Sequence, residues 1–385
     1  MRFTSAILIL LFKGIFFFYL AANSTAQVLN VDYFSIDNGL SQTSVLSIIQ
    51  DSRGFLWIGT QDGLNRFDGY TFKIYRNNPA DSLSLSNNYI NGLFEDSEGF
   101  IWVATNNGLN RYNPATEDFQ VYLPSKDNLN SLRENQVYDI YQDNLGFIWI
   151  KTDNFLSRLN LNNNTFRHYE HYNDVFSFIP TNPKFPIFED HKGQLWIGTK
   201  DGLNYFDRKL EIFKHYKNNP NDSSSLSNDR VKVIFEDSRK NLWIGTENGL
   251  NKFDWLTERF TRYNTSHNLC NNNINDIYED NNGKLWIGTD DGLNVYDYES
   301  DDFIVYDRFL HNSDQILATS FSSIMQDKTG ILWIGTIQGL LKVKEHNRLF
   351  KLYNKRANGE PLFSNNYIAS LFEKDGIVWV GTWGT

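Results

Sequence analysis

Residues 190–204 read DHKGQLWIGTKDGLN, and closely related stretches recur along the chain. The strictest part of each copy is a tryptophan, a β-branched residue, a third residue and a threonine, most often Trp-Ile-Gly-Thr. Consecutive copies lie 43 to 47 residues apart. A period in this range, carried by one short apolar strand, is typical of a β-propeller. The eight tryptophans are Trp57, Trp102, Trp149, Trp196, Trp243, Trp286, Trp333 and Trp379.

One repeat predicts four short strands. In the second repeat, tight turns at Glu95–Gly99 and Asn106–Gly108 have Asp, Asn and Gly where turn geometry favours them. Strands are predicted on either side of these turns, and a longer loop leads to the next repeat. Each repeat therefore predicts one four-stranded antiparallel blade. The predicted strands are 91–95, 100–105, 109–113 and 119–123.

Side chains alternate between the two faces of a strand, which assigns a role to each position of the repeated motif. Because tryptophan and glycine point opposite to isoleucine and threonine, both faces must be buried, and the strand must lie between neighbouring blades. We therefore predict that all eight tryptophans belong to the core and are not a platform for sugar stacking. The motif glycines are predicted to leave room for the tryptophan of the adjacent blade. They are Gly59, Gly198, Gly245, Gly288, Gly335 and Gly381.

Acidic pairs recur in the first turn of several repeats. Asp favours turns in which its side chain bonds to the following backbone. A propeller separates equivalent turns around a ring, so these carboxylates cannot converge on one ion. The segment 280–283 also lacks the downstream bidentate Glu of a calcium loop. No metal site is predicted from Glu95-Asp96, Glu189-Asp190, Glu236-Asp237 and Glu279-Asp280.

The N-terminus has the pattern of an export signal. Arg2 precedes an apolar stretch over 6–22, and Ser24-Thr25-Ala26 supplies small residues before Gln27. We predict a signal peptide over 1–26 and a periplasmic mature protein. An uncleaved membrane anchor is the alternative, although the stretch is short for a span of about 20 apolar residues.

A strand predicted over 31–36 stands alone before the first repeat. A propeller closes when its N-terminal strand completes the last blade, since open sheet edges invite aggregation. We predict that this strand completes the blade of Trp333, so that a seven-bladed propeller spans 27–346. Residues 347–385, with Trp379, are then the truncated first blade of a second propeller in a longer protein. A single eight-bladed ring is the alternative.

Composition excludes several classes of function. The net charge is −10 with a pI near 5.2, and no basic stripe is present, which argues against nucleic acid as a partner of this segment. Cys270 is the only cysteine, so no intrachain disulfide and no cysteine-based zinc site can form. No cofactor is predicted.

The pattern Asp-x-x-Gly-x-Leu-Trp-Ile-Gly-Thr-x-x-Gly-Leu-Asn resembles the two-component regulator propeller repeat family. Residues 51–65, 190–204 and 280–294 match it closely, and the opening 38–42, Asn-Gly-Leu-Ser-Gln, is similar to the usual start of these sensors. The resemblance covers residues 31 to 385. Its recurrence eight times makes it specific.

The resemblance implies modules beyond this segment. Such proteins carry two seven-bladed propellers and an immunoglobulin-like domain outside the membrane, followed by a transmembrane helix, a histidine kinase and a receiver domain. An oligosaccharide is the typical signal, transcription is the response, and the full-length sensor is expected to be a homodimer tethered in the inner membrane. None of the later modules is in this chain, so no catalytic residue is assigned and the segment itself is not expected to be an enzyme.

The third repeat departs from the pattern. Residues 149–156 read WIKTDNFL, with lysine in place of glycine and Phe-Leu in place of Gly-Leu, and an unusual loop comes next. Departures from an internal pattern can mark function or strain. Our hypothesis places Lys151, Asp153, His168 and His171 near a ligand or partner surface.

Two other functions compete with a sensor. A propeller lyase would need acid–base groups converging from several blades, whereas the seven histidines are predicted to take no equivalent blade position. A protein-binding scaffold would differ from a sensor only in the domains beyond residue 385. The loops 77–87 and 218–228 recur within the chain and are predicted to be structured turns. The histidines are His168, His171, His191, His215, His267, His311 and His346.

Overall fold

The computed structural model describes residues 27–170, 186–311, 314–316, 319–344, 368–374 and 377–382. The chain divides into two compact units, residues 1–344 and 345–385, and each is treated by itself. The predicted signal peptide over 1–26 lies outside the described residues.

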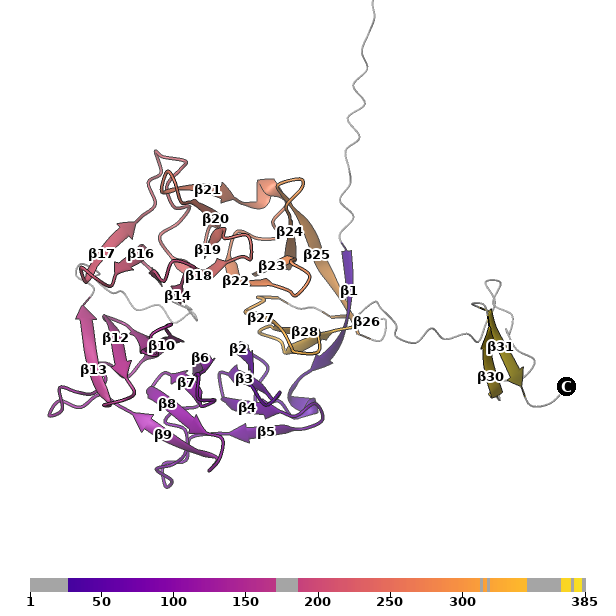
Figure 1. The fold of residues 1–385 in the computed structure, drawn as a ribbon, viewed down its shortest axis with the longest axis horizontal. Helices are drawn as coiled ribbons and strands as arrows, with labels where there is room; N and C mark the ends of the chain where they lie inside the picture. The colour runs from indigo at the N-terminus through magenta and orange to yellow at the C-terminus, as the bar shows by residue number, and fades with distance from the viewer. Residues whose placement is uncertain are drawn as a thin grey trace, which may run out of the picture. The chain divides into compact units, whose positions relative to one another are not determined.

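The first unit is a seven-bladed β-propeller, as predicted (Figure 1). In each blade the first strand lies nearest the centre of the ring, and the following strands pair outward in antiparallel order. Blade 1 consists of β2(Val45–Gln50), β3(Leu56–Thr60), β4(Gly63–Phe67) and β5(Phe72–Tyr75). Blade 2 consists of β6(Ile90–Glu95), β7(Ile101–Thr105), β8(Gly108–Asn113) and β9(Asp118–Tyr122). Blade 3 consists of β10(Val137–Gln142), β11(Ile148–Thr152), β12(Phe155–Asn160) and β13(Thr165–Glu170).

The remaining blades follow the same order, and blade 6 carries one additional short strand, β26(Asp314–Ile316). Blades 4 to 7 are β14(Ile187–Glu189), β15(Leu195–Thr199), β16(Gly202–Asp207) and β17(Ile212–Tyr216); β18(Val231–Glu236), β19(Leu242–Thr246), β20(Gly249–Asp254) and β21(Arg259–Tyr263); β22(Ile274–Glu279), β23(Leu285–Thr289), β24(Leu293–Asp297) and β25(Asp302–His311); and β27(Ser323–Gln326), β28(Leu332–Gly335) and β29(Leu340–Val343), completed by β1(Gln27–Phe34).

The N-terminal strand closes the ring. β1 pairs antiparallel with β29, with Val31 opposite Val343, which confirms the predicted closure and excludes the eight-bladed alternative. The first half of β1 also pairs in parallel with β25, so one strand joins blades 6 and 7. The strand ends two residues earlier than predicted, because Ser35 caps a short 3-10 helix, η1(Ile36–Asn38).

Seven of the eight motif tryptophans form the core, as predicted. Trp57, Trp102, Trp149 and Trp243 have no exposed surface, and the other three propeller tryptophans are at most 6% exposed. Trp379 is the exception, because it lies on β31(Ile377–Thr382) in the second unit and is 63% exposed. In the described part of that unit β31 pairs only with β30(Ile368–Lys374), so no neighbouring strand covers the indole. The assignment of 347–385 to a second propeller stays a prediction.

Each buried indole donates a hydrogen bond to an aspartate six residues earlier. In blade 2, Trp102 Nε1 lies 2.8 Å from Asp96 Oδ2, while Oδ1 accepts the backbone N–H groups of Glu98 and Phe100. The turn bonding predicted for these aspartates is therefore confirmed, but the indole bond was missed. The pairs, with distances of 2.7 to 3.0 Å, are Asp51–Trp57, Asp96–Trp102, Asp143–Trp149, Asp190–Trp196, Asp237–Trp243, Asp280–Trp286 and Asp327–Trp333.

The residue before each aspartate joins neighbouring blades. This residue is Glu or Gln, and its side-chain oxygen accepts a backbone N–H from the preceding blade. In blade 2, for example, Glu95 precedes Asp96 and accepts the N–H of Ser52, which follows Asp51 in blade 1. The seventh bond, from Lys328 N to Gln50 Oε1, completes the circle across the closure. The acceptors are Glu95 from Ser52, Gln142 from Ser97, Glu189 from Asn144, Glu236 from His191, Glu279 from Ser238, Gln326 from Asn281 and Gln50 from Lys328.

The motif glycines face a different neighbour from the one predicted. A Cβ atom at Gly59 would lie 2.6 Å from Ile90 Cγ2, and one at Gly335 would lie 2.6 Å from Val45 Cγ1. Both contacts are with the innermost strand of the next blade rather than with its tryptophan, so that prediction was wrong. The innermost strand runs along the seam, and its branched side chains fill the space that glycine leaves.

Candidate functional site

The propeller presents two chemically different ends of its central channel. The turns between the second and third strands of each blade lie on one face, together with the loops that connect blades. The other two turns of each blade lie on the opposite face. Innermost strands surround the centre in Figure 1 and connect the two ends.

Repeat comparison separates structural positions from variable ones. The residue after the motif threonine begins the turn at the first end of the channel, and its identity changes around the propeller, with only aspartate occurring twice. Repeated residues such as tryptophan and aspartate six positions earlier carry the fold, so a variable position is free to serve binding. These residues are Gln61, Asn106, Asp153, Lys200, Glu247, Asp290 and Ile337.

In several blades this turn residue is bonded to a side chain at the start of an innermost strand. We call the described residues of this network the polar mouth. All of them are partly or fully withdrawn from solvent. They are Asn91, Asn106, Gln136, Tyr138, Asp153, Arg230, Lys232, Glu247, Asn273, Asn275 and Asp290.

The mouth is amide- and hydroxyl-rich at blades 2 and 3. Asn106 Oδ1 accepts Asn91 Nδ2 at 2.9 Å and Gln136 Nε2 at 3.3 Å. The hydroxyl of Tyr138 donates to Asp153 Oδ1 at 2.6 Å. Burial and this bond to a carboxylate raise the pKa of Tyr138, so the phenol stays protonated at neutral pH.

At blades 5 and 6 the mouth joins opposite charges through two amides. Lys232 Nζ donates to Asn273 Oδ1 at 2.9 Å and also to Asn275 Oδ1. The two amide nitrogens donate in turn to Asp290, at 2.7 Å from Asn273 and 2.8 Å from Asn275. This hydrogen-bond network fixes the orientation of both amides, because a flipped amide would lose both of its charged partners.

The structure places the four predicted site residues in different surroundings. Lys151 is only 3% exposed, and its Nζ lies 2.6 Å from the carbonyl oxygen of Thr152 and 3.2 Å from that of Asp153. Lys151 and Asp153 are therefore brought together, with Asp153 in the mouth. His168 lies on the outermost strand β13, with Nδ1 2.8 Å from Ser157 Oγ. His171 lies outside the described residues, and a ligand role for all four stays a prediction.

The lysine at the motif glycine position accompanies a local change in the next blade. Elsewhere the space beside this position holds residues such as Ile90 or Ile274 from the following innermost strand. After blade 3 that strand, β14(Ile187–Glu189), has three residues, against six in β10(Val137–Gln142). The departure from the repeat thus coincides with a shorter innermost strand in the next blade.

Two histidines do occupy equivalent positions, contrary to the prediction. His168 pairs with Ser157 between β12 and β13, and His215 pairs with Asn204 between β16 and β17. Each Nδ1 contacts the side chain opposite it. Burial lowers the pKa of both imidazoles. They face the outer part of the blade, so they do not converge on the channel.

Two further kinds of chemistry concern the described residues, a reactive thiol at Cys270 and a metal-binding cluster. Burial raises the pKa of the Cys270 thiol to about 12, so the reactive thiolate is disfavoured. Within the described ranges no group of three or more His, Cys, Asp or Glu side chains is arranged to hold a metal ion.

Apart from Asp153, the polar mouth was missed because none of its other residues belongs to a recognisable motif. Its members lie in four blades, and sequence separations such as the 43 residues between Lys232 and Asn275 conceal their contacts. Only the variability of these positions among otherwise similar repeats could have indicated them.

Seven stretches of the chain match the two component regulator propeller family: residues 39–62, 84–107, 131–154, 225–248, 268–291, 315–338 and 362–384. Six of them lie in the seven-bladed propeller and end at or near the mouth turns. The chain belongs to the two-component regulator propeller family.

Solved structures similar to this regulator propeller include extracellular domains of bacterial sensors. The extracellular domain of a putative hybrid two component system from B. thetaiotaomicron is 28% identical, with a TM-score of 0.71, and the alignment covers 92% of this chain and 47% of that chain. A similar domain of a putative one component system from the same organism is 23% identical, with a TM-score of 0.64 and 91% and 44% coverage. A streptogramin B lyase, at 16% identity and a TM-score of 0.60, covers 82% of this chain and 97% of its own, and shares the fold alone.

Among curated proteins, Histidine kinase P4 of Formosa agariphila is 56% identical over 77 residues of this chain. Those residues are 20% of this chain and 6% of that kinase, so the chain spans a small part of this relative's length. In the described part of the chain, no helix has the length and apolar character needed to cross a membrane.

Proposed function

We propose that this regulator propeller is the extracytoplasmic ligand-sensing part of a two-component sensor. An oligosaccharide binds at the polar mouth, and the signal reaches transcription through a histidine kinase in the remainder of the protein. The observation that carries the proposal is the mouth itself, a set of variable polar side chains on an otherwise repetitive ring.

The chemistry of the mouth supports a polyhydroxylated ligand. Its amides, carboxylates and phenol offer both donors and acceptors at one end of the channel. Lys232 and Asp290 bring opposite charges to the same network, so a neutral ligand fits better than a strongly charged one. Hydrogen bonds among the side chains hold them in place before the ligand arrives, which lowers the entropic cost of binding.

The rest of the proposal rests on relatives. The similar solved domains are described as extracellular, and the curated relative as a histidine kinase. Residues 1–26 would direct export to the periplasm, and the continuing protein would supply the membrane tether and a dimeric kinase. Within the described residues no catalytic cluster supports the lyase alternative, and the lyase neighbours share only the fold.

The experiment is a thermal-shift screen of the exported protein against neutral and acidic oligosaccharides, followed by calorimetry on any ligand found. A ligand that binds only the folded state at 100 times its Kd stabilises it by about 2.7 kcal/mol. Tyr138→Phe and Lys232→Met should weaken binding. Tyr70→Phe is the matched control, because Tyr70 is 92% exposed in a turn on the opposite face. Unchanged affinity in both mouth variants would refute the assignment of the site.

A further inference from the structure

A second set of equivalent side chains surrounds the opposite end of the channel. Each lies two residues before the aspartate that holds the motif tryptophan, at the end of an innermost strand. Six are half-buried and Met325 is 8% exposed. We call them the collar: Ile49, Phe94, Tyr141, Phe188, Phe235, Tyr278 and Met325.

Five collar positions carry an aromatic ring, and the two exceptions are neighbours. Phe94 and Tyr141 have ring centroids 6.0 Å apart, within the range of favourable aromatic contact. Met325 in blade 7 and Ile49 in blade 1 lie on the two sides of the ring closure, where Lys328 N donates to Gln50 Oε1 at 2.7 Å. Two adjacent rings are therefore absent from one sector of the collar.

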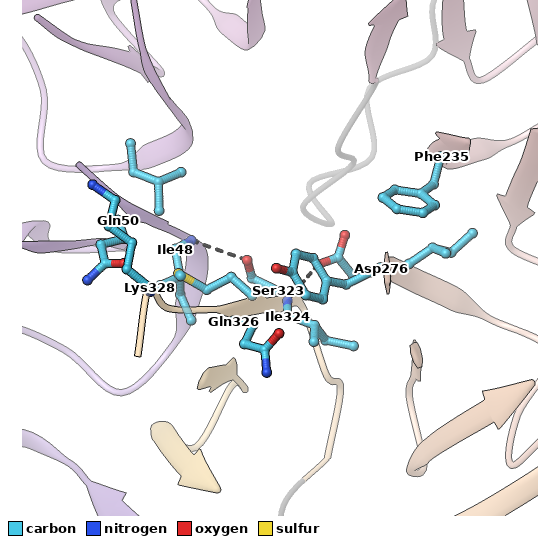
Figure 2. A pocket seen from close by; sticks show the side chains of 12 residues that line it. Ile48, Gln50, Phe235, Asp276, Ser323, Ile324, Gln326 and Lys328 are labelled. Carbon is cyan, nitrogen blue, oxygen red and sulfur yellow. Dashed lines mark hydrogen bonds between the residues drawn. The ribbon is translucent and has the colours of Figure 1, made fainter. Parts of the chain in front are cut away.

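A cavity of about 540 Å³ opens in that sector. Figure 2 shows Ile48 and Gln50 on one side of the cavity and Phe235 on the other. The volume falls within the range of small-molecule sites, and seven of the twelve lining residues are aliphatic or aromatic. Ile49 and Met325 line it together with the two aromatic collar residues of the neighbouring sector, Phe235 and Tyr278.

Five polar residues line the cavity, and each already bonds within the fold. Asp276 Oδ2 accepts Ile324 N at 2.6 Å, and Lys328 Nζ donates to the carbonyl oxygens of Asp51 and Ser52 at 3.0 and 2.8 Å. Gln50 Oε1 accepts Lys328 N at 2.7 Å, and Gln326 Oε1 accepts Asn281 N at 2.7 Å. On the channel side, Ser323 Oγ accepts Ile48 N at 3.2 Å. A ligand here would consequently be recognised through apolar faces, with only its edge meeting polar atoms.

We propose that this cavity binds a six-membered ring with an apolar face, which takes the place of the two aromatic side chains that blades 7 and 1 lack. An aryl group and the C–H face of a pyranose share this chemistry, and both can stack on the rings of Tyr278 and Phe235. The inference goes beyond the sensor function, because it concerns the other end of the channel and does not depend on binding at the polar mouth.

The probe for the test is p-nitrophenyl β-D-glucopyranoside, which carries both kinds of ring, measured by saturation-transfer NMR with the exported protein. Methyl β-D-glucopyranoside and p-nitrophenol, measured separately, distinguish the pyranose from the aryl group. We expect saturation of at least one ring by the unmodified protein. Saturation of neither would overturn the proposal.

Variants locate the binding. Met325→Phe and Ile49→Phe each restore an aromatic side chain that most blades already carry, and each should reduce the saturation at least fivefold by filling the cavity. Phe188→Met, the reverse exchange in blade 4 across the ring, should retain it. Thermal unfolding and circular dichroism establish which variants are folded. Undiminished saturation in either folded phenylalanine variant would overturn the proposal, whatever the affinity of the polar mouth for oligosaccharides.

Discussion

The indole of Trp57 donates a 3.0 Å hydrogen bond to the carboxylate of Asp51, and both side chains are fully buried. Asp51 also accepts the backbone N–H of Phe55, so one carboxylate fixes both the turn and the tryptophan that comes after it. A buried indole N–H without a partner would cost free energy comparable to a lost hydrogen bond. The turn and the strand of each blade are thus a single structural unit, repeated seven times.

Loss of one such carboxylate should destabilise the whole ring. Asp237 accepts Trp243 Nε1 at 2.9 Å, Tyr298 Oη at 2.8 Å and the backbone N–H of Asn241 at 2.8 Å. The backbone N–H of Arg239 and the side-chain amide of Asn241 also donate to it. We expect Asp237→Ala to lower the free energy of unfolding by about 3 kcal/mol, because five donors lose a charged acceptor. Urea-induced unfolding of the variant and of the unmodified protein measures this difference in free energy. Asp254→Ala, which removes an exposed aspartate that bonds only to its own turn, should cost less than about 1 kcal/mol; equal losses would contradict the prediction.

Closure through β1 can be tested within that strand. Val31 is fully buried opposite Val343, whereas Val28 is 37% exposed. A carboxylate at Val31 would be buried without a partner, so Val31→Asp should destabilise the propeller by about 3 kcal/mol or more and expose the blade 7 strands to protease. Val28→Asp supplies the control, and its melting temperature and proteolysis should remain close to those of the unmodified protein. Similar behaviour of the two variants would mean that closure contributes little to stability.

Seam packing predicts a steric effect at the motif glycines. A Cβ at Gly245 would lie 2.5 Å from Val233 Cγ1 and 2.6 Å from Ile274 Cγ2. Gly245→Ala should therefore cost about 2 kcal/mol through overpacking. Shortening the neighbour in the double variant Gly245→Ala/Ile274→Ala should make the two losses less than additive in a double-mutant cycle. Simple additivity would show that the alanine methyl group and Ile274 do not clash.

Acidification should weaken the propeller through its two equivalent histidines. Burial, and then the charge of Arg133, lower the pKa of His168 below the ordinary 6.5, while burial and then Lys217 lower that of His215. Because the unfolded chain binds these protons first, stability should fall as the pH drops from about 7 through the lowered folded pKa values. Each imidazole can contribute at most about 1.4 kcal/mol per pH unit.

The measurement is urea unfolding between about pH 7.5 and 5, a window that brackets the ordinary histidine pKa. The double variant His168→Gln/His215→Gln should flatten the dependence on pH in this window, even if its stability at the upper end is lower. A slope identical to that of the unmodified protein would assign the acid sensitivity to other groups.

Several features were accessible from the sequence because they are encoded within one repeat. The period of the tryptophan motif predicted the blades, and the isolated strand at 31–36 predicted how the ring closes. The side-chain alternation around Trp57 predicted a strand buried on both faces, and the structure confirms it. The same reasoning failed at Trp379, whose strand is described with one partner only.

Contacts between blades were decided by the tertiary structure. The sequence placed Glu95 beside Asp96, but only the fold shows that Glu95 accepts Ser52 N, 43 residues away. The space beside the motif glycine was expected to hold a tryptophan and instead holds the next innermost strand. The polar mouth likewise depends on pairs such as Lys232 and Asn275.

The sequence by itself thus determined the blade, its turns and the order of closure, since these depend on local alternation and turn chemistry. The tertiary structure decided which side chains meet across seams and around the channel. Those contacts join residues about one repeat apart in the sequence, and Gln50 and Lys328 are separated by nearly the whole propeller. A repeated local pattern contains no information about which seam a given side chain faces.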